Sequence, residues 1–243
     1  MSERCCSDID LCANVNNMKI SVVMPVYCEE DIINSAISVL KSIPAGAEFE
    51  VIVVDGGPGA LTLKNIRDES VVKIVSEPGR ARQMNAGAAK AGGEALLFLH
   101  ADTRLPENAF RAIEKALANK DIVAGAFRLS IDTKNPLLKF IAFTANIRTK
   151  LFRMPYGDQS VFFRKEYFEA IGGYKDIALM EDVEMMQRIK RKKGCIAIIG
   201  SKVLTSARRW EKEGVLRATL RNKLIKLLYN LGAQPEKLAR YYK

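Results

Sequence analysis

Short apolar runs alternate with helical patterns over the first hundred residues of the chain. The runs are rich in β-branched and large aliphatic side chains, which predicts strands buried on both faces at 19–27, 50–55, 71–75 and 96–99. Between these runs, apolar residues recur at helical spacing over 31–42 and from 80 to about 91. Strands that alternate with helices form βαβ units, so we predict an α/β fold with a mostly parallel central sheet flanked by helices.

The second half of the chain has a less regular pattern. It predicts helices at 108–118, 136–152, 165–171 and 180–192, and strands at 124–131, 160–164 and 195–199. A basic amphipathic helix at 215–231 closes the pattern. No internal repeat or linker interrupts it, so we predict a single domain over residues 18–243.

Residues 1–17 are polar and lack an apolar stretch, which predicts a disordered extension, or a start upstream of the true one, rather than a secretory signal. No run reaches 18 apolar residues, so no transmembrane helix is predicted. The five cysteines are odd in number and share no repeated spacing, which indicates neither a disulfide framework nor a zinc site. We therefore predict a cytoplasmic protein in a reducing compartment.

The charge balance favours an anionic partner. The chain has 38 basic and 28 acidic side chains, a formal charge of +10, and the excess is concentrated after residue 190. Nucleotides, phosphates, nucleic acid or an acidic membrane face would suit such a charge. Aromatic residues make up only 7% and do not alternate with the basic ones, so no nucleic acid is expected.

Three polar residues, His100, Asp102 and Thr103, follow the apolar run at 96–99 almost directly. In an open parallel sheet, ligands bind beyond the carboxyl ends of the strands. A carboxylate and an imidazole two residues apart suit a divalent metal and, through it, a diphosphate. The alternative is that Asp102 or Thr103 caps the helix that follows Pro106.

Asp55 ends an earlier strand and should enter the same crevice. The glycine-rich segment 56–59 lacks the third glycine of a dinucleotide-binding loop, because Thr62 stands in its place, so we reject that interpretation. The Asp55 carboxylate could accept a hydrogen bond from a nucleotide base or a ribose hydroxyl. Alternatively, it forms the turn before Gly56.

Two further places carry charge at predicted helix starts. Arg80 and Arg82 oppose the helix dipole, which favours a bound phosphate as compensation; solvated arginines are the alternative. Asp182 could be an ordinary helix cap or a general base directed at an acceptor hydroxyl.

Several motifs together resemble a known family. The segments ISVVMPVYCEE, FEVIVVDGG, EPGRARQMNAGAAKAGGEALLFLHADT, GDQSVFFRK and MEDVEM are similar, in this order, to those of family-two glycosyltransferases. The similarity extends from Met18 to about Trp210 and implies the nucleotide-diphospho-sugar transferase (GT-A) fold. More narrowly, GRARQMN, LFLHADT, GDQ and SARRWEKEG resemble the bacterial subfamily called selenodomain-associated transferase 2.

The resemblance implies a donor side for the site. Residues after the first strand would contact the base and ribose of the nucleotide, and these are Pro25, Tyr27 and Glu29. Asp55 would recognise a uracil-type base, and Arg80 and Arg82 would line the diphosphate. The segment His100-Ala101-Asp102 stands where the family has its metal-binding D-x-D. Because His100 replaces the first acid, the identity of the divalent metal, manganese or magnesium, is open.

The resemblance also implies an acceptor side. Asp182, in the Glu181-Asp182 pair, matches the catalytic base, and Asp158 and Gln159 match an acceptor-side loop. The segment containing Arg209 and Trp210 loosely resembles the Arg-Trp motif of processive members.

The implied reaction is an inverting transfer of a sugar from a nucleoside diphosphate, UDP by the match at Asp55, to a hydroxyl acceptor. The acceptor is unknown; the helix at 215–231 could hold a lipid-linked one at the inner face of an anionic membrane. Two alternatives stay open: a non-catalytic protein that binds nucleotide sugars or anionic surfaces, and a nucleotidyltransferase.

Overall fold

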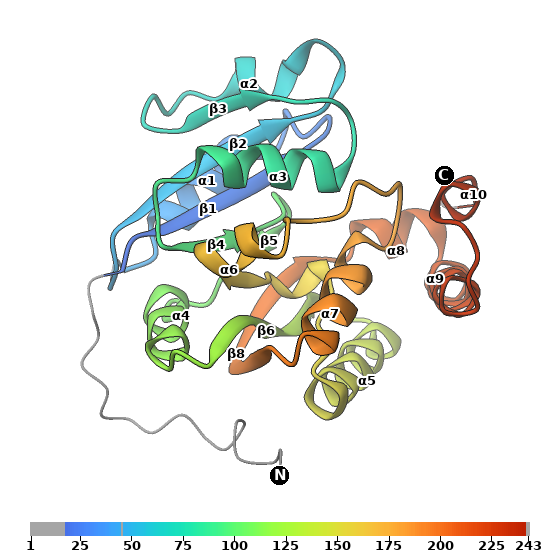
Figure 1. Cartoon of the computed structure of the whole chain (residues 1–243). Helices are drawn as coiled ribbons and strands as arrows, with labels where there is room; N and C mark the ends of the chain where they lie inside the picture. The colour runs from blue at the N-terminus through green and yellow to red at the C-terminus, as the bar shows by residue number, and fades with distance from the viewer. Residues whose placement is uncertain (1–17, 45, 242–243) are drawn as a thin grey trace.

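The computed structural model describes residues 18–44 and 46–241, which form a central sheet with helices on both faces (Figure 1). Within this range the sheet has eight strands in the order β3-β2-β1-β4-β7-β6-β8-β5. The strands are β1 (Ile20–Val26), β2 (Phe49–Asp55), β3 (Val72–Val75), β4 (Ala95–Phe98), β5 (Thr103–Arg104), β6 (Ile122–Asp132), β7 (Phe162–Arg164) and β8 (Cys195–Ser206). The predicted extension at 1–17 lies outside the described residues.

The first four strands form the parallel half of the sheet. β1 lies between β2 and β4, and β3 follows β2, all in parallel register. β7 then inserts antiparallel between β4 and β6, and β8 pairs parallel with β6. The prediction of an α/β fold with a mostly parallel sheet is confirmed.

Helices cover the two faces of the sheet unequally. One face packs against α1 (Ile33–Lys41), α2 (Leu61–Asn65), α4 (Ala109–Ala118) and α5 (Pro136–Phe152). The other face packs against α3 (Arg80–Lys90), α6 (Lys165–Ala170) and α7 (Glu181–Arg191). The central strands are therefore buried on both sides, as their apolar runs predict; every residue of β1 is buried.

Short or edge elements differ most from the sequence prediction. β8 continues to Ser206 instead of ending near residue 199, because its second half pairs with β6 and with the two-residue strand β5. The 3-10 turns η1 (Pro58–Ala60) and η2 (Gly157–Gln159), and the helices α8 (Arg208–Glu213) and α10 (Pro235–Ala239), are too short to give a clear periodicity.

The predicted basic helix is α9 (Val215–Asn230). Only Ala218 and Ile225 of this helix are buried, while its leucines face outward. The expectation of a simple amphipathic helix therefore needs correction, because apolar residues occupy both the inner and the outer side. In the described part of the chain, no helix has the length and apolar content needed to cross a bilayer.

Candidate active site

The carboxyl ends of three adjacent parallel strands meet at one edge of the sheet. β1 runs into Tyr27 and Glu29, β2 ends on Asp55, and β4 is followed by His100 and Asp102. β1 pairs with both β2 and β4, so these residues are neighbours in space. The three strand ends therefore lie side by side, as the predicted order of strands and helices implies.

Asp55 faces its own loop rather than an open crevice. Its side chain is fully buried, and its two oxygens accept hydrogen bonds from the backbone N–H groups of Gly57 (2.7 Å) and Thr62 (3.1 Å). These contacts fit the alternative in which Asp55 forms a turn. Pro25 is likewise buried within β1, opposite Val54, whereas Tyr27 is exposed.

Gln83 is a buried residue that no pattern in the sequence singles out. From α3 it donates through Nε2 to the carbonyls of Val26 (2.6 Å) and Val54 (2.9 Å). These carbonyls lie at the ends of β1 and β2. Gln83 thus joins the two strands where the crevice begins, and only its burial in the fold reveals this role.

A three-residue charge network lies beside the end of β4. Arg208 binds both carboxylate oxygens of Glu29 through Nη2 (2.7 and 2.8 Å), and its Nε is 3.4 Å from Oδ2 of Asp102. The sequence comparison favoured Arg209 and Trp210 in this segment. Instead, Arg209 pairs with Glu213 within α8 and Trp210 packs against the core. Arg208 is the residue of this segment that reaches the strand ends.

A cavity of about 350 Å³ opens next to this network. Asp102, Arg104 and Arg208 line it. Asp31, from the loop before α1, and Ser35, from the first turn of α1, line it as well. Its lining contains two arginines and three carboxylates, those of Asp31, Asp102 and Asp132, a mixture that suits a ligand with both anionic and hydroxyl groups. Ala101 also lines it.

Asp182 is held in place by two backbone groups at the start of α7. Its Oδ2 accepts from the N–H of Gly157 (2.9 Å) and its Oδ1 from the N–H of Val183 (2.7 Å). A Cβ atom on Gly157 would lie 3.5 Å from Nε2 of His100 and 3.7 Å from this Asp182 oxygen. The Cα of Gly157 therefore faces both the candidate base and His100. Met180, before the helix, has a left-handed backbone conformation (φ 70°).

Two more carboxyls near Asp182 have raised pKa values. Burial raises the pKa of Asp158 to about 6, and the charge of Asp182 adds to this effect against the opposing charge of Arg148. Burial and then Asp182 raise the pKa of Glu181 to about 7. The positive charge of Arg80 acts on both groups. Carboxyls that keep a proton near neutral pH are typical of sites that transfer protons.

Two predicted residues are not part of this arrangement. Gln159 is fully buried; its Oε1 accepts from the Thr149 hydroxyl (2.9 Å) and its Nε2 donates to the Phe127 carbonyl (3.0 Å). It supports the loop without facing an acceptor. Arg82 forms an exposed ion pair with Asp176 (2.9 Å), so Arg80 is the arginine of α3 that acts on the site.

His100 and Asp102 meet the basic requirements of metal ligands. Burial and the charge of Arg80 lower the pKa of His100 to about 4, which keeps the imidazole neutral, as a ligand must be. Across residues 18–44 and 46–241, no group of three or more His, Cys, Asp or Glu side chains could enclose an ion. The pair therefore fits an ion whose remaining ligands are diphosphate oxygens and water.

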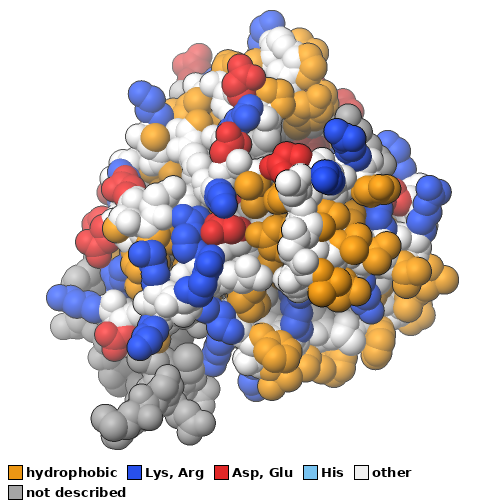
Figure 2. Space-filling view, turned by 45° about the vertical axis from the view of Figure 1, so that its right-hand side comes forward, with side chains coloured by type: hydrophobic (Ala, Val, Ile, Leu, Met, Phe, Trp, Pro, Cys, Tyr) orange, Lys and Arg blue, Asp and Glu red, His pale blue; other side chains and the backbone are white. Residues whose placement is uncertain are grey.

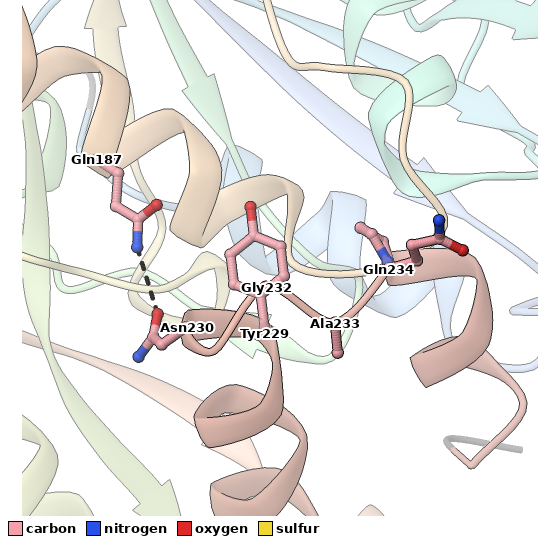
Figure 3. Close-up of a pocket in the computed structure, with 7 residues that line it drawn as sticks. Gln187, Tyr229, Asn230, Gly232, Ala233 and Gln234 are labelled. Atoms are coloured by element: carbon pink, nitrogen blue, oxygen red, sulfur yellow. Dashed lines mark hydrogen bonds between the residues drawn. The ribbon is translucent and has the colours of Figure 1, made fainter.

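A second cavity, of about 390 Å³, lies where α7, α9 and the segment before α10 meet (Figure 3). Amide groups dominate its polar lining, with Gln187 donating to Asn230 (3.4 Å) across it. None of its lining residues is charged. It takes no part in the arrangement around Asp102 and Asp182.

The sheet order and the carboxylates at the strand ends define an α/β protein with a candidate site at the carboxyl edge of its parallel strands. The sequence profile of Glycosyl transferase family 2 matches residues 21–172. The chain belongs to this family.

Known relatives and structures agree with this assignment. The chain is 25% identical over 198 residues to the probable glycosyltransferase YdaM of Bacillus subtilis, and 25% identical over 116 residues to a dolichol-phosphate mannosyltransferase of Pyrococcus furiosus. These matches cover 70% and 45% of this chain but only 46% and 33% of the two relatives. The chain thus spans less than half the length of either.

Two solved structures share the fold. The mannosyltransferase PcManGT of Pyrobaculum calidifontis, in complex with GDP-Man and Mn²⁺, matches 93% of this chain and 69% of its own, with a TM-score of 0.62 and 16% identity. TarS 1–349 of S. aureus matches 78% and 61%, with a TM-score of 0.60 and 16% identity. The GT-A fold is therefore confirmed for this chain.

Proposed function

We propose that this protein is an inverting glycosyltransferase that moves a sugar from a nucleoside-diphosphate sugar, UDP-linked by the sequence resemblance, to a hydroxyl acceptor. The observation that carries the proposal is the position of Asp182. Asp182 and His100 both lie next to Gly157, Asp182 has two other carboxyls beside it, and Asp102 and Arg208 line a cavity at the strand ends. One side of this arrangement suits a diphosphate and the other suits a proton acceptor.

On the donor side, cationic groups of the chain bind and orient the diphosphate. Arg208 is already paired with Asp102 and Glu29, and it can share its guanidinium with phosphate oxygens. Arg80, at the start of α3, adds positive charge close to His100. Asp102 and His100 would hold a divalent ion here, and the chemistry such an ion supplies is neutralisation of the charge on the departing diphosphate.

On the acceptor side, Asp182 removes the proton of the attacking hydroxyl. Its two hydrogen bonds to backbone N–H groups fix its orientation before an acceptor arrives. The hydroxyl attacks the sugar carbon from the face opposite the diphosphate, so the configuration at that carbon inverts. The raised pKa values of Glu181 and Asp158 fit a site in which negative charge gathers around the base.

The test is the variant Asp182→Asn, compared with Asp176→Asn as an exposed acidic control. A placed base contributes about 10²–10⁴-fold, so we expect transfer by Asp182→Asn to fall by this factor while nucleotide-dependent thermal stabilisation persists. Asp176→Asn should keep both properties. Retained turnover in Asp182→Asn, or loss of nucleotide binding with it, would contradict the assignment of the base.

The product released from the nucleotide sugar distinguishes a glycosyltransferase from a nucleotidyltransferase and from a binding protein. A set of nucleotide sugars, each tested with manganese, magnesium or a chelator, should identify the donor and the metal. Release of a nucleoside diphosphate supports glycosyl transfer, whereas release of pyrophosphate would indicate a nucleotidyltransferase. Nucleotide-sugar binding without any release, across a broad range of acceptors, would indicate a binding protein.

A further inference from the structure

The helix α5 presents its apolar side chains outward. Phe140, Phe143 and Leu151 are 56–69% exposed, whereas the polar residues Asn146 and Thr149 are buried against the sheet. Asn146 holds the backbone of Leu129 through two hydrogen bonds, and Leu138 and Ala142 are buried on the same side. The inward face is therefore mixed, and several of the largest apolar side chains of α5 stay outside, where a helix that only covers a sheet carries polar residues.

The helix α9 also exposes large apolar side chains, although its two buried residues, Ala218 and Ile225, are apolar as well. Its outward leucines are spaced three or four residues apart and form one stripe, 55–75% exposed, made of Leu216, Leu220, Leu224 and Leu227 and continued by Leu231 just beyond the helix. Ile225 faces the other way, into a small cluster with Leu179 and Leu238. Figure 2 shows hydrophobic side chains gathered on the side of the molecule where Figure 1 places α9.

The two helices approach each other at Tyr156. The guanidinium carbon of Arg148, from α5, lies 3.5 Å from the centre of the Tyr156 ring, and Nζ of Lys226, from α9, lies 5.0 Å from it. The exposed faces of α5 and α9 thus flank one aromatic side chain. We call them together the α5–α9 surface; its exposed apolar members are Leu137, Phe140, Phe143, Ile147, Leu151, Phe152, Leu216, Leu220, Leu224, Leu227, Leu228 and Leu231.

The charge of this surface restricts what can cover it. Helix α5 contains three Lys or Arg residues and α9 contains four, and neither contains Asp or Glu. Arg148 and Lys226 face Tyr156 and Arg221 pairs with Glu213, which leaves four exposed cations, Lys139, Lys150, Arg217 and Lys223. A second copy packed face to face would bring these positive charges together, which disfavours a symmetric dimer through this surface. Large apolar side chains flanked by Lys and Arg, without acids, are the composition of helices that lie in the interface of an anionic bilayer.

We propose that the α5–α9 surface docks this protein onto an anionic lipid bilayer, with both helices lying in the headgroup layer of one leaflet. The acceptor side adjoins this surface, because Tyr156 precedes Gly157, the residue that holds Asp182. Resting on the proposed function, this placement makes a hydroxyl acceptor anchored in the same leaflet the substrate class that suits the site.

Vesicle sedimentation of the full-length protein tests the proposal. The protein should sediment with vesicles of equal parts phosphatidylcholine and phosphatidylglycerol, less so at high salt, and little with phosphatidylcholine alone. The double variant Leu220→Gln/Leu224→Gln should bind the anionic vesicles at least about tenfold more weakly. Leu61→Gln is the matched control, because Leu61 is 53% exposed but lies on α2, away from the surface.

A second variant tests how much the positive charges of α9 contribute to vesicle binding. Arg217→Gln/Lys223→Gln removes two exposed charges of α9, and we expect a loss of about fivefold for each charge with a weaker salt dependence. Circular dichroism of each variant checks that it folds. Equal vesicle binding by the wild type and the leucine variant, or equal binding to neutral and anionic vesicles, would overturn the proposal. So would a wild-type dimer that the leucine variant dissociates.

Nucleotide binding keeps the two proposals separate. The leucine variant should lose vesicle binding and keep nucleotide-dependent thermal stabilisation. If the wild type binds vesicles but no nucleotide sugar, the proposed function fails while the docking surface stands. If it binds and turns over a nucleotide sugar with a water-soluble acceptor but ignores vesicles, the docking surface fails alone.

Discussion

The donor and acceptor sides of the candidate active site differ in how their buried polar groups are paired. On the donor side, Asp55 and Gln83 are buried and fully engaged by backbone groups, and Arg208 satisfies Glu29 and Asp102. On the acceptor side, Asp158 and Glu181 carry pKa values raised by burial and by the charge of Asp182.

The Asp55 carboxylate therefore stabilises the fold, whereas the carboxyls of Asp158 and Glu181 are candidates for a chemical role. A buried carboxylate that accepts two N–H bonds stabilises its loop, and removing it leaves those donors without partners. A carboxyl whose pKa is raised by burial destabilises the folded state once it ionises. Substitution of Asp55 is therefore expected to lower stability, whereas substitution of Arg208 or of the acceptor-side carboxyls is expected to lower activity.

The largest effect on the donor side is expected from Arg208→Ala. Loss of the guanidinium removes the charge that we assign to the diphosphate, so kcat/KM for the donor should fall by roughly 10–100-fold, as for a lost charged hydrogen bond. The free energy of unfolding should change by less than about 1 kcal/mol, because the pair is partly exposed. Arg209→Ala, its neighbour paired within α8, is the matched control and should keep most of the activity.

Asp55→Asn tests the structural role on the same side. An amide nitrogen cannot accept the N–H of Gly57 or Thr62, so the free energy of unfolding should fall by about 1–3 kcal/mol in urea denaturation. Asp158→Asn should do the opposite at pH 7 and raise stability. Equal losses in both variants would remove the distinction between the two sides.

The pH dependence of stability and of kcat tests the assignment of the acceptor-side carboxyls. Glu181 has a pKa of about 7 in the folded protein against an ordinary value of 4.5, so it favours the folded state most below pH 4.5, and this contribution is lost as the pH rises to about 7. Between pH 6 and 7 Asp158 and then Glu181 ionise beside Asp182, and their negative charge stabilises the positive charge that develops on the sugar and the attacking hydroxyl in the transition state. We therefore expect kcat to rise over this range.

Glu181→Gln identifies the residue responsible. It should remove the upper inflection of the kcat profile and flatten the decrease in unfolding free energy between pH 4.5 and 7. An unchanged profile in this variant would assign the rise to another group.

The smallest effect is expected from Arg82→Ala. Arg82 and Asp176 form an exposed ion pair, and such pairs contribute about 0–1 kcal/mol. Donor affinity in isothermal titration should change by less than about twofold. A large loss of donor affinity would instead support the contact between Arg82 and the diphosphate that the sequence resemblance implies.

Much of this could be predicted from the sequence, because the signals were local. The apolar runs of β1 and β2 and the polar residues that follow them are adjacent in the chain, so the strand ends and their convergence were predictable. The narrower resemblance to selenodomain-associated transferase 2, the UDP donor and the metal stay predictions.

The rest depends on contacts between distant segments. Nothing local distinguishes Arg208 from Arg209, and only the start of α8 decides which one reaches Glu29 and Asp102. The turn role of Asp55 follows from the burial of its loop, and the role of Gln83 from the packing of α3 on two strand ends. From the sequence alone, the leucines of α9 would be assigned to the core. Only the fold shows that they lie on the side of the helix that no other element of the described chain covers.

The hydrogen bond between Gly157 and Asp182 bears on the regiochemistry of the proposed reaction. With one lone pair of each Asp182 oxygen occupied by a backbone N–H, an incoming hydroxyl can approach only along the directions that are left. A polyhydroxylated acceptor would then be modified at the position that fits this approach, and the choice would depend on a backbone N–H that, among substitutions of Gly157, only proline removes.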